Sequence, residues 1–231
     1  MKKVAIHSQK GGSGKTTTAV SLAVQAEKAG RTTAVIDLDP QANATSWGDR
    51  RQAETPVIIS AQAARLAQVL NAAEQNGAEI VFIDTPPRAS EVALAAVKAA
   101  DLVLIPCRPA VFDLDTMETT RDLIKTAGRQ VPVMAVLNGI PATGFKKREQ
   151  AEEIIRSYGI EVCPSALAHR AAFADSMTLG LGPQEFDPEG NAAKEIHGVY
   201  NFLCELLNDK TRKGVKDNGP ESRRLAISNA K

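Results

Sequence analysis

Residues 8–17, with the sequence SQKGGSGKTT, decide how this chain folds. They follow a short apolar segment at 4–7 and lead into a helical pattern at 16–29. A strand, a glycine-rich turn and a helix in this order form a phosphate-binding loop, because the glycines let successive backbone N–H groups point inward and the start of the helix adds partial positive charge. The stretch therefore predicts a site for the phosphates of a nucleotide.

The spacing within this loop assigns tasks to individual residues. Lys15 is placed to reach the β- and γ-phosphates, and the Thr16 hydroxyl is placed to ligate Mg²⁺. The other predicted nucleotide contacts come from the rest of the loop: Gly11, Gly12, Ser13, Gly14 and Thr17. The loop departs from the common pattern G-x-x-x-x-G-K-[ST] at its first position, where Gln9 replaces the glycine and Lys10 follows.

Short apolar runs alternate with longer amphipathic segments along the chain, which is typical of a parallel sheet wrapped by helices. The predicted strands are 4–7, 33–38, 57–59, 80–83, 102–105, 133–137 and 160–162. The predicted helices are 16–29, 61–75, 91–99, 114–126, 147–157 and 192–207. We therefore expect a single-domain α/β fold of the P-loop NTPase type, with a twisted, mostly parallel sheet and helices on both faces.

Composition sets limits on the class of protein. The 231 residues include 28 basic and 27 acidic side chains, so no overall field attracts nucleic acid or an acidic membrane. No apolar run approaches the roughly 18 residues that cross a bilayer, and three widely spaced cysteines suit buried thiols in a reducing cytosol. Residues 208–231 hold seven basic and three acidic side chains and few apolar ones, so we expect a folded domain over 1–207 and a basic, disordered tail.

Two further segments place carboxylates at the ends of predicted strands. Asp37 and Asp39 lie two residues apart in the sequence DLDPQ, so they project to the same face where their strand ends. Asp84 ends another apolar strand in the form of a Walker B element and is predicted to hold Mg²⁺ through water, with Asp37 near the same metal shell. Because ligands of open parallel sheets bind beyond the carboxyl ends of the strands, these carboxylates are expected to face the phosphates.

The segments KGGSGKTT, DLDPQ and DTPP together resemble the deviant Walker A ATPases of the ParA/MinD family. The resemblance covers roughly residues 1–207 and is strong to about Pro109. It implies that Lys10 reaches across a dimer interface to the phosphates of ATP bound by the other subunit. It also implies that Asp39 positions or activates the attacking water, so that Lys10, Lys15 and Asp39 are the candidate catalytic residues.

The resemblance extends to the predicted base-binding side of the site. In this family an Asn at the end of the strand that matches 133–137 commonly contacts adenine, and here that residue is Asn138. Asn is also a frequent turn former, so a purely local role stays open. The segment that contains Pro164 follows the next strand and could flank the base.

The function that the resemblance implies is ATP-dependent DNA partition by a slow, partner-stimulated ATPase with ATP and Mg²⁺ as cofactors. ATP would close a homodimer, the dimer would bind DNA without sequence preference, and a ParB-like centromere-binding protein would stimulate hydrolysis and release. The expected location is the cytoplasm, on the nucleoid. Candidate DNA contacts are Lys146, Lys147 and Arg170, although basic runs are often only solvated helix faces.

Two other classes of function remain as alternatives. A MinD-like positioning ATPase shares the loop but ends in an amphipathic membrane helix, and the terminal sequence RRLAI has too few large apolar residues for firm anchoring, so no stable membrane association is expected. A metabolic P-loop enzyme such as a dethiobiotin synthetase would have no use for Lys10. Asp113 and Asp115 are interpreted as helix caps rather than catalytic groups, and the scattered His7, His169 and His197 do not predict a zinc site.

Overall fold

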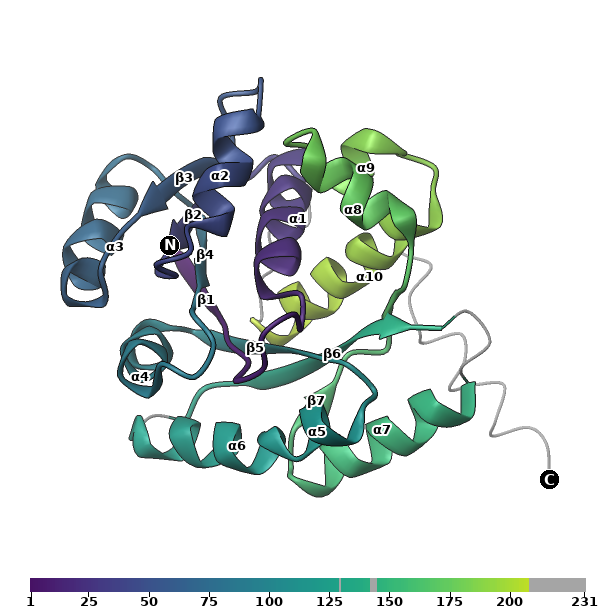
Figure 1. The fold of residues 1–231 in the computed structure, drawn as a ribbon. Helices are drawn as coiled ribbons and strands as arrows, with labels where there is room; N and C mark the ends of the chain where they lie inside the picture. The colour runs from purple at the N-terminus through teal and green to yellow at the C-terminus, as the bar shows by residue number, and fades with distance from the viewer. Residues whose placement is uncertain (129, 142–144, 208–231) are drawn as a thin grey trace, which may run out of the picture.

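The computed structural model describes residues 1–128, 130–141 and 145–207. The predicted basic tail at 208–231 lies outside these residues. Within them the chain forms one α/β unit with a parallel sheet between two layers of helices, which confirms the predicted fold class (Figure 1).

The sheet has eight strands among the described residues, and every strand pairing that they form is parallel. The order is β3-β2-β4-β1-β5-β6-β7, and β8 pairs with β6. The bounds are β1 (Lys2–Ile6), β2 (Thr33–Asp37), β3 (Val57–Ser60), β4 (Ile80–Asp84), β5 (Leu102–Cys107), β6 (Val133–Ile140), β7 (Glu161–Val162) and β8 (Leu167–Ala168). All seven predicted strands are present, whereas β8 is too short for its sequence to show a periodic pattern.

The helices include several that the sequence patterns do not predict. The bounds are α1 (Lys15–Lys28), α2 (Asn43–Arg50), α3 (Leu66–Gln75), α4 (Ser90–Ala99), α5 (Val111–Leu114), α6 (Thr116–Thr126), α7 (Phe145–Ser157), α8 (Ala171–Thr178), α9 (Pro183–Phe186) and α10 (Asn191–Leu206). The unpredicted helices are α2, α5, α8 and α9. In α2 only Ala44 and Trp47 are buried, and two buried positions do not form a detectable apolar stripe.

One predicted helix starts later than expected. The pattern at 61–75 predicts a helix, but α3 begins at Leu66, and a 3₁₀ turn covers Ala63–Arg65. The cause is a continuation of the sheet, because the Ala61 N–H donates to the Asp37 carbonyl and extends the pairing of β3 with β2.

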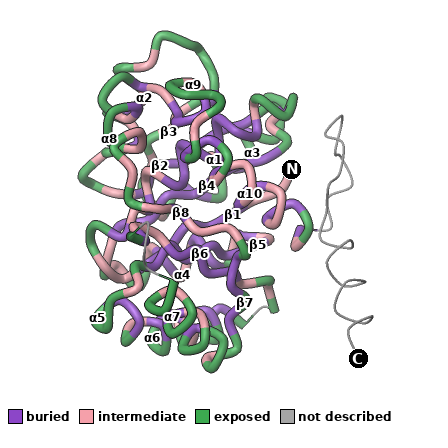
Figure 2. Tube along the Cα trace, turned by 90° about the vertical axis from the view of Figure 1, so that its right-hand side faces the viewer, coloured by how far each residue is buried: buried purple, intermediate pink, exposed green. Residues whose placement is uncertain are grey.

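Alternate residues of the central strands feed two separate cores. Val4 and Ile6 of β1 pack with α1 and α10, whereas Ala5 between them packs with the core under α3, α4, α6 and α7. Both faces of the strands are therefore buried, as their continuous apolar sequences predict. Figure 2 shows this arrangement as buried strands inside a less buried shell of helices.

The sheet order fixes where a ligand can bind. β1 lies between β4 and β5, and the strands that follow it in sequence lie on both sides of it. The register places Asp84 of β4 opposite Ile6 of β1 and Asp37 of β2. The loops after these three strands therefore meet at one edge of the sheet, at the switch point where α/β proteins bind ligands.

Candidate nucleotide-binding site

The loop between β1 and α1 has the backbone geometry of a phosphate cradle. Gly12 and Gly14 have φ angles of 71° and 89°, in the left-handed region that residues with side chains rarely adopt. Gly14 caps the start of α1, and its carbonyl accepts the N–H of Thr18. The first N–H groups of α1 therefore lie at the edge of the loop, where a helix attracts anions.

Two of the predicted magnesium ligands are in direct contact. The Thr16 hydroxyl donates to Asp84 Oδ2 at 2.6 Å, although the two residues are 68 positions apart. Asp84 Oδ1 is buried and makes no hydrogen bond within the described part of the chain. Burial raises the pKa of Asp84 to about 7, and the Thr16 hydrogen bond opposes the rise. Thr16 and Asp84 offer only oxygen atoms, and Asp84 Oδ1 has a lone pair that no hydrogen bond uses within the described residues. Such a donor set fits Mg²⁺, whose charge would favour the deprotonated form of Asp84.

Asp37 has a second role that its sequence position did not reveal. Its side chain is fully buried, Oδ1 accepts the N–H of Asp39 at 3.0 Å, and Oδ2 accepts both the N–H and the hydroxyl of Thr45 at 3.0 Å. Asp37 therefore fixes the turn from β2 into α2. Asp39 is half-buried and its Oδ1 accepts the N–H of Gln41 at 2.9 Å.

The two lysines of the loop lie in different surroundings. Lys15 is buried, and its ammonium donates to the Lys10 carbonyl at 3.1 Å. Burial lowers the pKa of Lys15, and the negative charges of Asp84 and Asp39 partly restore it. The Lys10 ammonium instead lies 5.6 Å from the centroid of the Phe112 ring, on an exposed part of the surface.

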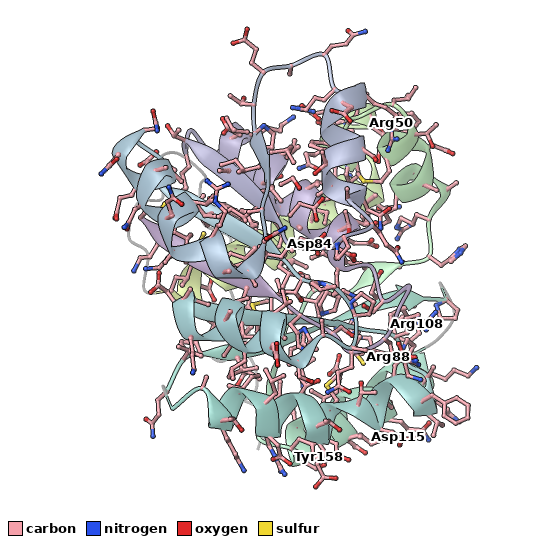
Figure 3. The ribbon with its side chains drawn as sticks, turned by 60° about the vertical axis from the view of Figure 1, so that its left-hand side comes forward. Arg50, Asp84, Arg88, Arg108, Asp115 and Tyr158 are labelled. Carbon is pink, nitrogen blue, oxygen red and sulfur yellow. The ribbon has the colours of Figure 1, made fainter. Side chains whose placement is uncertain are left out.

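The loop borders a cavity of about 370 Å³. Lys15, Thr16 and Asp39 line it, together with Trp47 of α2 and Met177 of α8. The cavity brings together residues of the loop and of the DLDPQ segment, as the sequence predicts, whereas α2 and α8 supply walls that it does not predict. Figure 3 shows Asp84 near the middle of the molecule, with Arg50 of α2 towards the surface.

Comparison with known proteins agrees with this geometry. The family model of the CobQ/CobB/MinD/ParA nucleotide binding domain matches residues 4–183. The chain is 32% identical over 213 residues to the maintenance of carboxysome distribution protein A of Gloeobacter kilaueensis, which covers 91% of this chain and 95% of that protein. The chain belongs to the ParA/MinD family of P-loop ATPases.

Other relatives and a solved structure agree with this family membership. Protein ParA of Rhizobium radiobacter is 26% identical over 221 residues, covering 91% of this chain and 98% of that protein. The septum site-determining protein MinD of Pyrococcus horikoshii, solved with Mg-ADP, has the same fold, with a TM-score of 0.75 at 17% identity over 92% of this chain and 99% of that chain.

In this ParA/MinD-family chain, the two residues predicted to contact the base, Asn138 and Pro164, form hydrogen bonds with other parts of the chain. The Asn138 amide donates to the Ser13 carbonyl at 2.8 Å, and this amide also occupies the space that a Cβ on Gly14 would need. Asn138 therefore supports the phosphate loop from the end of β6. Pro164 is exposed, and its carbonyl accepts a hydrogen bond from Arg148 at 2.6 Å.

The candidate DNA contacts differ in their availability. Lys146 and Lys147 are exposed on α7. Arg170 precedes α8 and donates through Nε and Nη2 to Glu195 Oε1, at 2.9 and 2.7 Å, so its charge is already partnered. Among the described residues, no helix combines the length and apolar character needed to cross a bilayer.

The interpretation of Asp113 and Asp115 as helix caps is correct in position only, since Asp115 is the N-cap residue of α6 and Asp113 lies in the first turn of α5. Neither α5 nor α6 has a side-chain cap hydrogen bond, and the Asp113 carboxylate instead accepts two hydrogen bonds from Arg108. Asp113 is buried, and Arg108 lies five residues earlier in the sequence, before the turn that leads into α5. The three- and four-residue spacing of a helix therefore does not predict this ion pair. The prediction that the cysteines are buried is confirmed for Cys107, Cys163 and Cys204.

Proposed function

We propose that this chain is a partition ATPase: ATP closes a homodimer, the dimer binds DNA without sequence preference, and a ParB-like partner stimulates slow hydrolysis that releases it. The observation that carries the nucleotide part of the proposal is the contact of Thr16 with Asp84, because it joins the start of α1, which lines the cavity, to the Walker B strand behind it. The Mg-ADP complex of the structurally similar MinD supports ATP and Mg²⁺ as the ligands.

The residues of the phosphate loop and the nearby carboxylates then have defined tasks. Lys15 and the backbone of residues 11–17 bind the phosphates, and Thr16 and Asp84 hold Mg²⁺, which when bound offsets charge on the β- and γ-phosphates. Asp39 lines the same cavity and orients the attacking water. The Asp39→Ala variant should bind ATP with wild-type affinity and hydrolyse it much more slowly, and a wild-type hydrolysis rate would rule this role out.

The dimer part of the proposal depends on Lys10. Its ammonium lies at the surface over Phe112, which is 74% exposed, next to Val111, which is 70% exposed. An exposed cation beside exposed apolar side chains is a surface that a second copy could cover, with Lys10 donated to the facing triphosphate. In the dimer each nucleotide site would receive the Lys10 ammonium of the facing copy, and a triphosphate offsets this added positive charge better than a diphosphate does. ATP, and not ADP, should therefore favour the dimer.

DNA binding is proposed for the basic surface of α7. Lys146 and Lys147 are exposed and can contact phosphates without reading bases, whereas Arg170 would first have to leave Glu195. The test is co-sedimentation with DNA of unrelated sequences in ATP or ADP at low and high salt. Retention that depends on ATP and falls with salt supports the proposal, and equal retention in both nucleotides contradicts it.

Two kinds of cargo, a replicon and a protein assembly, are candidates for what this chain moves. The relatives named ParA and Soj support a replicon, and these include the chromosome-partitioning ATPase Soj of Thermus thermophilus at 25% identity. The 32% identical relative is named for carboxysome distribution, which supports a protein assembly carried over the nucleoid. Deletion of the gene separates them, because loss of plasmid or chromosome inheritance indicates a replicon and mispositioned assemblies with normal inheritance indicate the second candidate.

The proposed location is on the nucleoid rather than on a membrane. A fluorescent fusion should cover the nucleoid, and the purified chain should not co-sediment with anionic liposomes in either nucleotide. ATP-dependent liposome binding without DNA binding would instead support the MinD-like alternative.

A further inference from the structure

One guanidinium beside the phosphate loop has no place in the pocket described above. Arg108 follows β5 directly, and it is labelled in Figure 3. Its Nε donates to Asp113 Oδ1 at 3.0 Å and its Nη2 donates to Asp113 Oδ2 at 3.2 Å. Two parallel hydrogen bonds to one carboxylate fix the plane of the guanidinium as well as its position.

In this ion pair the carboxylate of Asp113 is buried, whereas the side chain of Arg108 is partly exposed. The Asp113 side chain is 5% exposed and the Arg108 side chain is 44% exposed. A buried carboxylate that lost its cation would be strongly unfavourable, so Asp113 holds Arg108 in place. The pair therefore presents one edge of an immobilised guanidinium to the surface.

The free edge of Arg108 points along the phosphate loop. A Cβ built on Gly12 would lie 3.9 Å from Arg108 Nη1, and one built on Gly139 would lie 3.9 Å from its Cγ. Within the described part of the chain, Nη1 makes no hydrogen bond, although it carries two N–H donors. Nη1 is thus an unused donor beside the glycine whose backbone is predicted to cradle phosphate.

We propose that Arg108 binds a phosphate of the nucleotide, with Asp113 as its positioning residue. This inference rests on the proposed function, since the loop must hold a nucleotide. A fixed planar donor suits a phosphate oxygen better than a flexible ammonium does, and the same chemistry is offered by the nucleotide of the same chain or by that of the facing copy. The two sources differ in whether a monomer can make the contact.

The test compares Arg108→Gln and Arg108→Lys with the wild type in two measurements. Calorimetry measures the affinity of the monomer for MgADP, and light scattering measures dimerisation with a nonhydrolysable ATP analogue and Mg²⁺. We expect Arg108→Gln to lose roughly tenfold or more, the usual effect of one charge-assisted hydrogen bond. Weaker MgADP binding assigns the contact to the same chain, and unchanged MgADP binding with weaker dimerisation assigns it to the facing copy. Arg108→Lys should recover only part of the loss.

A matched control and a cycle of variants separate this role from a structural one. Arg121→Gln removes another arginine that is paired with carboxylates, on α6, and should change neither measurement. Asp113→Asn should weaken the same measurement as Arg108→Gln, and the double variant, which removes both charges of the pair, should be no weaker than Arg108→Gln alone.

The contradicting results are distinct for the two proposals. If Arg108→Gln and the double variant fold and match the wild type within twofold in both measurements, Arg108 does not bind phosphate. If the wild type itself binds neither MgADP nor the ATP analogue, the proposed function fails and the inference with it.

Discussion

The two sides of the phosphate loop are held by different kinds of residue. On the inner side, Lys15, Thr16 and Asp84 come from contiguous motifs that lie at the ends of β1 and β4. On the outer side, Arg108 directly after β5 lies beside the loop, and Asn138 late in β6 donates a hydrogen bond to it, both from about a hundred residues further along the chain. The inner side follows from sequence motifs, whereas the outer side depends on tertiary structure. The loop is therefore supported from both halves of the sheet, although only the half with β1 and β4 carries sequence motifs for nucleotide binding.

The largest effect is expected on the inner side. The Lys15→Ala variant should lose more than about a hundredfold in ATP affinity, because each charge-assisted hydrogen bond to phosphate contributes roughly 1.5–3 kcal/mol. Its thermal stability should not fall, since the buried ammonium is desolvated in the free protein. Calorimetry and thermal unfolding check the two parts, with the exposed Lys125→Ala as the control. Wild-type affinity in Lys15→Ala would contradict the assignment of the inner side.

A pH-dependent effect is expected at the base of the loop. The Thr85 hydroxyl donates to the Ile6 carbonyl, so His7 Nδ1 must donate to Thr85, and Nε2 stays buried without a hydrogen-bond partner among the described residues. Burial lowers the pKa of His7 from 6.5 to about 4, with a smaller contribution from the charge of Lys15. Between these values the unfolded chain binds a proton that the folded chain does not, so stability falls as the pH drops from 6.5 towards 4.

The size of this effect follows from the shift. The wild type should lose about 3 kcal/mol of unfolding free energy relative to His7→Gln between pH 6.5 and 4. Asp84, whose raised pKa acts in the opposite direction over an overlapping range, is present in both proteins and cancels in the comparison. Urea denaturation at several pH values measures the difference, and a gap that stays constant with pH would contradict it.

A smaller effect tests the outer side directly. Gly14→Ala would collide with the Asn138 amide and force a side chain into left-handed backbone, so it should destabilise the fold by roughly 1–3 kcal/mol. Gly11→Ala in the same loop is the matched control, because no atom lies within 4 Å of its Cβ position. Denaturant unfolding compares the two, and equal stabilities would mean that Asn138 does not support the loop.

The smallest effect is expected at the exposed ring. Phe112→Leu removes the aromatic face beneath Lys10 and should reduce stability by about 0.5–1 kcal/mol, whereas Phe112→Tyr should keep it. The same denaturation experiment measures both variants. A loss of several kcal/mol in Phe112→Leu would show that the ring has a structural role that its exposure does not indicate.

The sequence predicts the fold better than it predicts the walls of the site. Continuous apolar strands and the SQKGGSGKTT loop are local signals, and they locate seven strands, the parallel sheet and the contact region of Thr16 with Asp84. Helix α2 is missed because only two of its residues are buried, and β8 because two residues carry no period. The pairing of Arg108 with Asp113 is missed because it spans a turn, where no helix or strand spacing relates the two side chains.

We propose that two copies of this chain enclose a pair of nucleoside triphosphates. The decisive measurement is light scattering of the purified protein with saturating nonhydrolysable ATP analogue and Mg²⁺. We expect twice the chain mass of 24.6 kDa for the wild type and for Asp39→Ala, and the single chain mass for Lys10→Ala or with ADP. A wild type and an Asp39→Ala variant that both remain monomeric under these conditions would contradict the account.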